Sequence, residues 1–286
     1  PPPPPPPPPP FFFHPEPGIP DAQESRGLGD VYKRQNSSMS KIEVNNDGPI
    51  KTIILNRPEK RNALDQEMLD SLYEIFSEKV SVDARAIVLR GNGPSFCAGI
   101  DLAERQRQPS TGAVSPVEKV FHAMEVNPQP IVSIVQGAAI AGGCEMALHS
   151  EFVVAAETAK FGMSLAQIGL APSWFLTKKL LEVAGPVNTR EILLLGDPMP
   201  SSWMLDKGII SRVAPDAQLE QEAGKIIQRL AINAPLSLKA MKALIIRELA
   251  FRDGIAHDDV DELVTAARGS QDAKEGIAAR LSLIHI

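Results

Sequence analysis

Short apolar runs alternate with amphipathic stretches through the first half of this chain, and this alternation restricts the folds that it can adopt. Strands are predicted over 41–45, 50–56, 85–91, 130–137 and 152–157. Helices are predicted over about 65–80, 117–126 and 140–150, and a polar loop over about 104–115. Strands that alternate with helices in this way predict an α/β domain with parallel crossover connections.

The second half of the chain has a different pattern. From about Ser173 onward the helical period dominates, with helices predicted over 174–184, 187–195, 218–232, 236–251 and 256–268 and one short strand in ISRVAP (210–215). We therefore expect an α/β core over 39–215 and a C-terminal helical region over 216–280. Such a helical region would serve packing, oligomerisation or both.

Both ends of the chain are unlike a folded domain. Ten consecutive prolines open the sequence, and such a tract forms polyproline II or stays disordered. The hexapeptides DVYKRQ (30–35) and LSLIHI (281–286) can be encoded by GATGTGTATAAGAGACAG and its reverse complement, a pair that resembles the two strands of a sequencing-library adaptor. We expect 1–38 to be a non-native or disordered leader, 281–286 a non-native tail, and the native chain to start at Met39.

Composition excludes several classes of function. The net charge is −6 without a basic stripe, which argues against a nucleic-acid partner. No apolar run approaches the roughly 18 residues that cross a bilayer, so no membrane partner is expected. Cys97 and Cys144 lie in apolar segments without metal-ligand spacing, which predicts no metal and a reduced, cytoplasmic protein.

Two segments with small residues suggest a binding site for a negative atom. In QGAAIAGGCE (136–145) glycines follow a strand and open a helix, where free N–H groups and the helix dipole favour an anion. Tight strand–helix packing explains that segment equally well. SFCAGIDLAE (95–104) also places small residues after a strand and a turn. Two converging N–H groups would stabilise an oxyanion, and loss of one such donor costs about a hundredfold or more in rate.

Three motifs resemble one protein family. LNRPEKRNALD, FCAGIDL and GAAIAGGCEMAL occur in the order and spacing of the enoyl-CoA hydratase/isomerase, or crotonase, superfamily, and the likeness extends over about 41–280. The resemblance implies a spiral of strand-strand-helix repeats with a C-terminal helical layer, assembled as a homotrimer or a dimer of trimers. It also implies an acyl-CoA thioester as the substrate, with no separate cofactor because coenzyme A is part of that substrate.

The resemblance also assigns roles to individual residues. The N–H groups of Ile100 and Gly142 match the oxyanion donors that hold the thioester carbonyl, and Glu145 matches the first of two glutamates that position water and move its proton. The coenzyme A pocket is implied by two segments, which include Arg61, Ala63, Ala98, Asp101, Leu102 and Ala103. Lys60 and Arg61 would meet the phosphates of coenzyme A or stay solvated, while Asp101 is interpreted as structural.

The second glutamate position of the family is occupied by Leu165, in FGMSLAQIG (161–169). An apolar side chain cannot relay protons, and a positioned acid or base supplies about 10² to 10⁴ in rate. Glu145 would then act alone, with a pKa raised by dry surroundings, or Glu118 or His122 would replace the missing group unless both are solvated.

Several nearby residues have a functional and a structural interpretation. Ser173, Trp174 and Gln167 would shape the acyl pocket or serve packing and capping, and His149 would pair with Glu145 or interact with the helix dipole. Cys144 is expected in the core, and Ser173 stands where a related dehalogenase-like site would carry aspartate.

Three hypotheses about function remain open. The first is an enoyl-CoA hydratase-type lyase with Glu145 as its single acid–base group. The second is another crotonase-type reaction, catalysed by an isomerase, decarboxylase or thioesterase, which Leu165 favours. The third is an acyl-CoA-binding protein without catalysis.

Overall fold

The computed structural model of this chain describes residues 40–107 and 115–284, which belong to one compact unit. The leader predicted over 1–38, the start at Met39 and the last two residues of the tail predicted over 281–286 lie outside the described residues. Residues 281–284 continue the last helix of the chain. The helical region predicted over 216–280 lies in the same compact unit as the α/β core.

Nine strands form two sheets among the described residues. They are β1 (Ile42–Asp47), β2 (Ile50–Leu55), β3 (Ala86–Gly91), β4 (Ile131–Val135), β5 (Ala138–Ile140), β6 (Phe152–Ala156), β7 (Lys160–Gly162), β8 (Met199–Pro200) and β9 (Arg212–Ala214). The larger sheet has the order β1-β2-β3-β4-β6-β9 and the smaller one has the order β5-β7-β8. The chain therefore crosses between the two sheets after β4, β5, β6 and β8.

The pairing within the large sheet confirms the predicted parallel crossovers. β1 and β2 form an antiparallel hairpin, and every other neighbouring pair in this sheet is parallel. The central strand β4 is buried along its whole length, which explains why PIVSIV carries no alternation of polar residues.

The helices fill the connections between the strands. They are α1 (Gln66–Ser77), α2 (Leu102–Arg107), α3 (Pro116–Val126), α4 (Gly142–Leu148), α5 (Trp174–Arg190), α6 (Ser201–Asp206), α7 (Leu219–Ile232), α8 (Pro235–Leu249), α9 (Asp258–Gly269) and α10 (Gln271–Ile284). Short 3₁₀ turns are η1 (Pro58–Lys60), η2 (Ala166–Ile168), η4 (Asp216–Gln218) and η5 (Ala250–Arg252), and η3 (Glu191–Leu195) is a π-helical turn.

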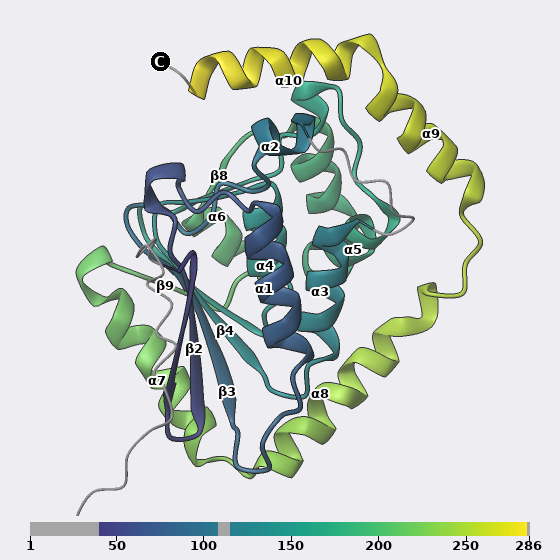
Figure 1. The fold of residues 1–286 in the computed structure, drawn as a ribbon. Helices are drawn as coiled ribbons and strands as arrows, with labels where there is room; N and C mark the ends of the chain where they lie inside the picture. The colour runs from purple at the N-terminus through teal and green to yellow at the C-terminus, as the bar shows by residue number, and fades with distance from the viewer. Residues whose placement is uncertain (1–39, 108–114, 285–286) are drawn as a thin grey trace, which may run out of the picture. The chain divides into compact units, whose positions relative to one another are not determined.

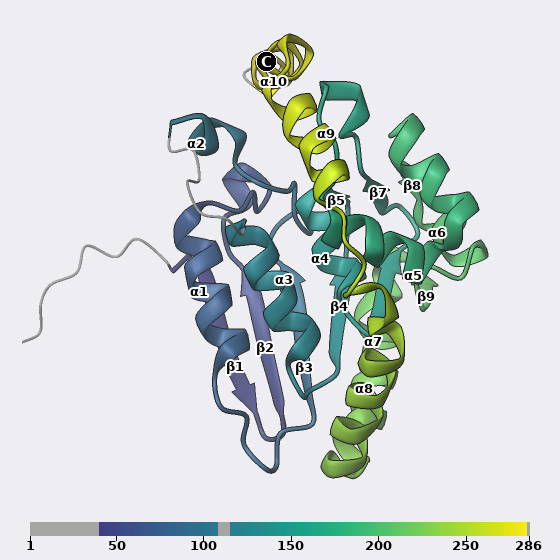
Figure 2. The ribbon, with the colours of Figure 1, turned by 90° about the vertical axis from the view of Figure 1, so that its right-hand side faces the viewer.

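Helices cover both faces of the large sheet. Figure 1 shows α1 and α3 side by side on one face and α7 on the opposite face, where it contacts β3, β4, β6 and β9. In Figure 2 the chain continues from α8 through α9 to α10. α10 packs against the short turn η2. That contact is close, because a Cβ atom on Gly276 would lie 2.6 Å from the Ile168 carbonyl oxygen.

Two helix boundaries follow from local sequence signals. Asp65 caps α1, accepting a hydrogen bond from the Met68 N–H at 3.0 Å. The predicted break between 184 and 187 is also confirmed, because Gly185 takes a φ of 66° and Pro186 follows it.

One predicted element was wrong in part. The polar loop predicted over 104–115 begins inside a helix, since α2 spans Leu102–Arg107. Asp101 starts this helix because its carboxylate accepts hydrogen bonds from the N–H groups of Ala103 and Glu104. Residues 108–114 of the predicted loop lie outside the described residues.

The C-terminal helices leave large apolar side chains exposed in the single chain. These side chains include Ile232, Leu236, Met241, Leu244, Ile245 and Leu263. Exposed apolar side chains of this number are typical of surfaces that contact another protein. No helix among the described residues is both long enough and apolar enough to cross a membrane. The homotrimer expected from the resemblance stays a prediction.

Candidate active site

The two segments expected to bind coenzyme A lie side by side. The Ala98 N–H donates to the Arg61 carbonyl at 2.9 Å, and the Leu64 N–H donates to the Gly99 carbonyl at 2.7 Å. The Asp101 N–H then returns a bond to the Leu64 carbonyl at 2.8 Å. Backbone pairing thus aligns 61–64 with 98–101, although Ala98 lies 34 positions after Leu64 in the sequence.

Asn62 anchors both segments, and sequence analysis did not single it out. Its side-chain amide is fully buried and donates to the carbonyls of Asn92, Ser95 and Phe96 at 2.9 to 3.1 Å. Arg61 and Asn62 both have positive φ, at 50° and 55°. A buried asparagine in a left-handed turn of this kind fixes the loop that leads to Ile100.

The predicted oxyanion donors are brought together by the small sheet. The Cys97 N–H donates to the Ala138 carbonyl at 3.1 Å and the Ile140 N–H to the Cys97 carbonyl at 3.0 Å, so β5 is tied to the loop that carries Ile100. A Cβ atom on Gly142 would lie 3.7 Å from the Ile100 nitrogen. A Cβ atom on Gly99 would lie 3.2 Å from the Gly142 nitrogen.

Glycine is required where the two segments meet. A Cβ atom on Gly143 would lie 2.1 Å from the Cys97 carbonyl oxygen, far inside any allowed contact. Ala141, which precedes the helix, adopts a φ of 48° and a ψ of −118°. Strain of this kind is held at functional sites by surrounding contacts, and here the Ala141 N–H is fixed by a 2.7 Å bond to the Gly162 carbonyl.

Neither candidate donor has a hydrogen-bond partner of its own in the part of the chain that the structure describes. Among the described residues, the N–H groups of Ile100 and Gly142 donate no hydrogen bond, whereas their neighbours Asp101 and Ala141 both do. Gly142 is the first residue of α4, where the N–H has no helical partner and the helix dipole is positive. Two free, adjacent N–H groups suit the oxygen of a polarised carbonyl.

Glu145 lies one helical turn after Gly142 in a dry environment. It is 7 % exposed, and its Oε1 atom finds no hydrogen-bond partner among the described residues. Burial, followed by the negative charge of Glu118, raises the pKa of Glu145 to about 8. A carboxyl with this pKa exchanges its proton near neutral pH, as a general acid or base must.

His149 is the C-cap residue of α4, which is the helix-end position that the sequence suggested. Its ring is fully buried between Phe121 and Phe175, with centroid distances of 5.3 and 5.0 Å. Burial first, and then the charge of Lys179, hold the pKa of His149 well below its usual value. The Nε2 atom lies 3.9 Å from the Glu145 Oε1 atom. A neutral imidazole therefore forms one wall beside Glu145.

Asp101 has a structural environment, as expected. Its carboxylate accepts a 2.9 Å hydrogen bond from Arg57 and caps α2. Burial alone would raise the pKa of Asp101, but the bonds from the Glu104 N–H and from Arg57 outweigh it and lower the pKa overall. The carboxylate therefore stays ionised and holds the loop after Ile100.

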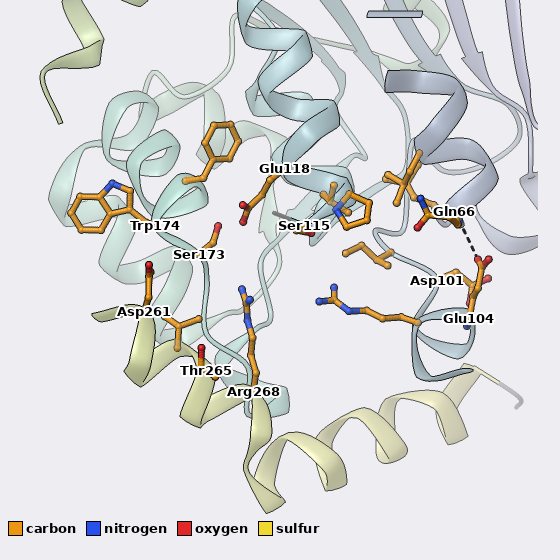
Figure 3. Close-up of a pocket in the computed structure, with 18 of the residues that line it drawn as sticks. Gln66, Asp101, Glu104, Ser115, Glu118, Ser173, Trp174, Asp261, Thr265 and Arg268 are labelled. Carbon is orange, nitrogen blue, oxygen red and sulfur yellow. Dashed lines mark hydrogen bonds between the residues drawn. The ribbon is translucent and has the colours of Figure 1, made fainter. Parts of the chain in front are cut away.

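A cavity of about 570 Å³ opens next to Ile100. α1, α2, α3, the start of α5 and α9 form its walls (Figure 3). Of the residues predicted for the site, Ile100 and Asp101 line this cavity. The others, Arg61, Ala63, Ala98, Leu102, Ala103, Gly142, Glu145 and Leu165, do not line it. Their assignments as binding or catalytic residues stay predictions.

Leu165 and Gln167 have packing and hydrogen-bonding partners, and Ser173 both caps a helix and lines the cavity. The Leu165 side chain packs against the hydrophobic core. Ser173 caps α5 by accepting from the Leu176 N–H at 3.2 Å, and Gln167 donates to the Leu195 carbonyl. Cys144 is buried in the core, and burial raises the pKa of its thiol to about 12.

The two residues considered as substitutes for the missing glutamate have different surroundings. His122 is exposed on α3 and does not line the cavity beside Ile100. Glu118 does line that cavity, and Figure 3 shows its carboxylate directed inward. Trp174 lines it as well, with its ring stacked on His257 at 4.5 Å.

The fold and this geometry agree with a family assignment. A family model described as enoyl-CoA hydratase/isomerase matches residues 45–281. The chain belongs to this family. It is therefore a crotonase-type protein of a family of acyl-CoA enzymes, with the crotonase fold that the three motifs predicted.

Individual relatives are similar along most of the chain. A putative enoyl-CoA hydratase of Thermus thermophilus is 32% identical over 243 residues, covering 81% of this chain and 94% of the relative. The 2,3-dehydroadipyl-CoA hydratase of Escherichia coli is 28% identical, covering 85% and 96%. A crystal structure of methylmalonyl-CoA decarboxylase has a TM-score of 0.77 and 25% identity, covering 86% of this chain and 96% of that one. Family members with this fold thus carry names of more than one reaction.

Proposed function

We propose that this protein is an enoyl-CoA hydratase-type lyase that uses Glu145 as its single acid–base group. The N–H groups of Ile100 and Gly142 hold the thioester carbonyl oxygen, and segments 61–64 and 98–103 hold coenzyme A. The observation that carries the proposal is the position of Glu145, a buried carboxyl one turn after a free N–H donor with a pKa of about 8.

The reaction needs one group that takes a proton and returns it. Ionised Glu145 removes a proton from water while the water oxygen forms a bond to the β-carbon of the enoyl thioester. The electron pair of the carbon–carbon double bond moves to the carbonyl, giving an enolate that the two N–H groups stabilise. Protonated Glu145 then gives its proton to the α-carbon, which restores the carboxylate. The product is a 3-hydroxyacyl thioester.

Decarboxylation is a second candidate, and the environment of position 165 favours it. Loss of carbon dioxide from a 2-carboxyacyl thioester produces the same enolate without activating water. Only one proton must then be delivered to the α-carbon, and Glu145 is mostly protonated below its pKa of about 8. A second glutamate is unnecessary for that step, which is compatible with an apolar, packed Leu165.

Mass spectrometry of the products separates these reactions. The full chain is incubated with a panel of 2-enoyl-CoA, 3-enoyl-CoA, 2-carboxyacyl-CoA and saturated acyl-CoA thioesters. The proposal expects a mass gain of one water molecule on a 2-enoyl-CoA. Loss of carbon dioxide would instead support a decarboxylase. An unchanged mass with a shifted double bond would support an isomerase, and release of free coenzyme A would support a thioesterase.

Two variants test the assignment of Glu145 and the role of position 165. Glu145→Gln should abolish hydration while leaving acyl-CoA binding intact, and normal turnover by this variant would refute the mechanism. Leu165→Glu should raise hydration if the second carboxylate is what the family pattern lacks here. Binding of every thioester without turnover of any would favour an acyl-CoA-binding protein.

A further inference from the structure

Two arginines from distant parts of the chain face the same cavity. Arg105 belongs to α2 and Arg268 to α9, and both line the cavity next to Ile100. Figure 3 shows Arg268 extending from α9 toward Glu118 and Ser173. A cavity that held only an unsubstituted hydrocarbon chain would be lined mainly by apolar side chains.

Neither guanidinium forms an ion pair within 40–107 and 115–284. Arg268 donates only a long hydrogen bond of 3.4 Å to the Ala171 carbonyl. Partial burial and then the positive charge of Arg268 lower the pKa of Arg105, so the two like charges are close enough to repel each other. An anion between them would relieve this repulsion and accept hydrogen bonds from both.

Most carboxylates of the cavity are engaged with other partners. Asp101 binds Arg57 at 2.9 Å, Asp261 contacts His257 at 2.8 Å, and Glu104 accepts from the Gln66 N–H at 3.3 Å. Glu118 is the remaining one, and its charge acts on Arg105 without a direct ion pair.

We propose that Arg105 and Arg268 form an anion subsite for the acyl group, and that the preferred substrate is an acyl-CoA whose acyl chain ends in a carboxylate. This inference rests on the proposed function, which places the thioester carbonyl at Ile100 and coenzyme A along 61–64 and 98–103. The cavity meets these segments at Leu64, Ile100 and Asp101, next to the position assigned to the thioester carbonyl, whereas Arg61, Ala63 and Ala98 lie outside it. The cavity is therefore assigned to the acyl side of the thioester.

Binding of two matched thioesters tests the subsite. Adipoyl-CoA and hexanoyl-CoA have the same chain length, neither undergoes hydration, and only adipoyl-CoA has a terminal carboxylate. Isothermal titration calorimetry on the full chain should show about 10- to 100-fold tighter binding of adipoyl-CoA, the range expected for a charge-assisted hydrogen bond. Equal affinity for the two would overturn the subsite, whereas binding of neither would overturn the proposed function itself.

Variants at the two arginines identify which anion they bind. Arg268→Gln and Arg105→Gln should each remove most of the preference without weakening hexanoyl-CoA, while Arg268→Lys should keep part of it. Arg107→Gln is the control, because Arg107 lies on the same helix but does not line this cavity. Equal weakening of both thioesters by the glutamine variants would assign the arginines to a phosphate of coenzyme A. Pantetheine thioesters of the two acids lack the nucleotide phosphates. If the glutamine variants then bound these thioesters as tightly as the unchanged chain does, the assignment of the arginines to the acyl group would be overturned.

Discussion

Two carboxylates flank the pair of free N–H groups, and their surroundings are opposite. Asp101 directly follows Ile100 and is bound by Arg57 and by two N–H groups of α2, so its pKa is lowered. Glu145 follows Gly142 by one turn, and burial and the charge of Glu118 raise its pKa to about 8. The same functional group is thus a fixed support on one side and, in the proposed mechanism, the proton carrier on the other, because the surroundings differ.

The largest expected effect is a difference in turnover rate between variants of Glu145 and of Asp101. Glu145→Gln should lower the rate by about 10² to 10⁴, the usual contribution of a positioned acid or base. Asp101→Asn should lower it by less than about tenfold, since the change weakens only a loop support. Steady-state kinetics on the substrate found with the thioester panel measure both. Similar losses in the two variants would contradict the assigned difference in role.

The next effect concerns the contact that brings the two N–H groups together. Gly143→Ala should force the Cys97 loop away from α4, because the added Cβ would lie 2.1 Å from the Cys97 carbonyl oxygen. We expect a loss of about 10²-fold or more in rate, as for removal of one oxyanion donor. Gly224→Ala in α7 is the matched control, since no atom lies within 4 Å of its added Cβ. That control should keep activity and should not lower the melting temperature.

A third effect appears in the pH dependence of stability. Between about pH 4.5 and pH 8 the unfolded chain ionises Glu145 while the folded chain keeps the proton, so the folded state loses stability as the pH rises. Glutamine does not titrate. The free energy of unfolding of Glu145→Gln should therefore exceed that of the natural chain by an amount that grows by about 1.4 kcal/mol per pH unit in this window. Urea unfolding at several pH values measures the difference, and a constant difference would show that Glu145 is not perturbed.

The smallest effect tests the influence of Glu118 on Glu145. Glu118→Gln removes the second cause of the raised pKa and leaves burial, the largest cause, in place. The pKa of Glu145 should fall by roughly one unit and stay well above 4.5. Carbon-13 NMR of labelled glutamate side chains follows this titration. A fall to the ordinary value would mean that charge rather than burial controls Glu145.

Much of the fold and of the candidate site was predictable from the sequence. The features that were missed depend on contacts between residues far apart in the sequence. The three motifs predicted the fold and the neighbouring positions of Ile100 and Gly142, and the apolar patterns predicted the strands of the large sheet and most of the longer helices. Asn62 was missed because its three carbonyl partners lie 30 to 34 positions away in the sequence. The stacking of His149 between Phe121 and Phe175 was missed for the same reason, since α3, the C-cap of α4 and α5 supply one ring each.

The C-terminal part of the site was the least predictable. Helix periodicity predicted that α9 exists, but not that it returns to the cavity beside Ile100 and places Arg268 opposite Glu118. This return depends on the contact of α10 with η2 around Gly169 and Gly276, where a Cβ on either glycine would lie within 2.6 Å of backbone atoms. A single glycine in a helical sequence pattern does not indicate which segment will pack against it.

Exchange of the α-proton of a saturated acyl-CoA with deuterium oxide tests the central claim most directly. This exchange needs only the carbonyl held by Ile100 and Gly142 and a base at Glu145, and it does not depend on which overall reaction the protein catalyses. We expect mass spectrometry to show catalysed exchange whose rate rises with pH through about 8 as Glu145 ionises. Glu145→Gln should abolish the exchange, and exchange at an unchanged rate in this variant would contradict the role of Glu145 beside the oxyanion hole.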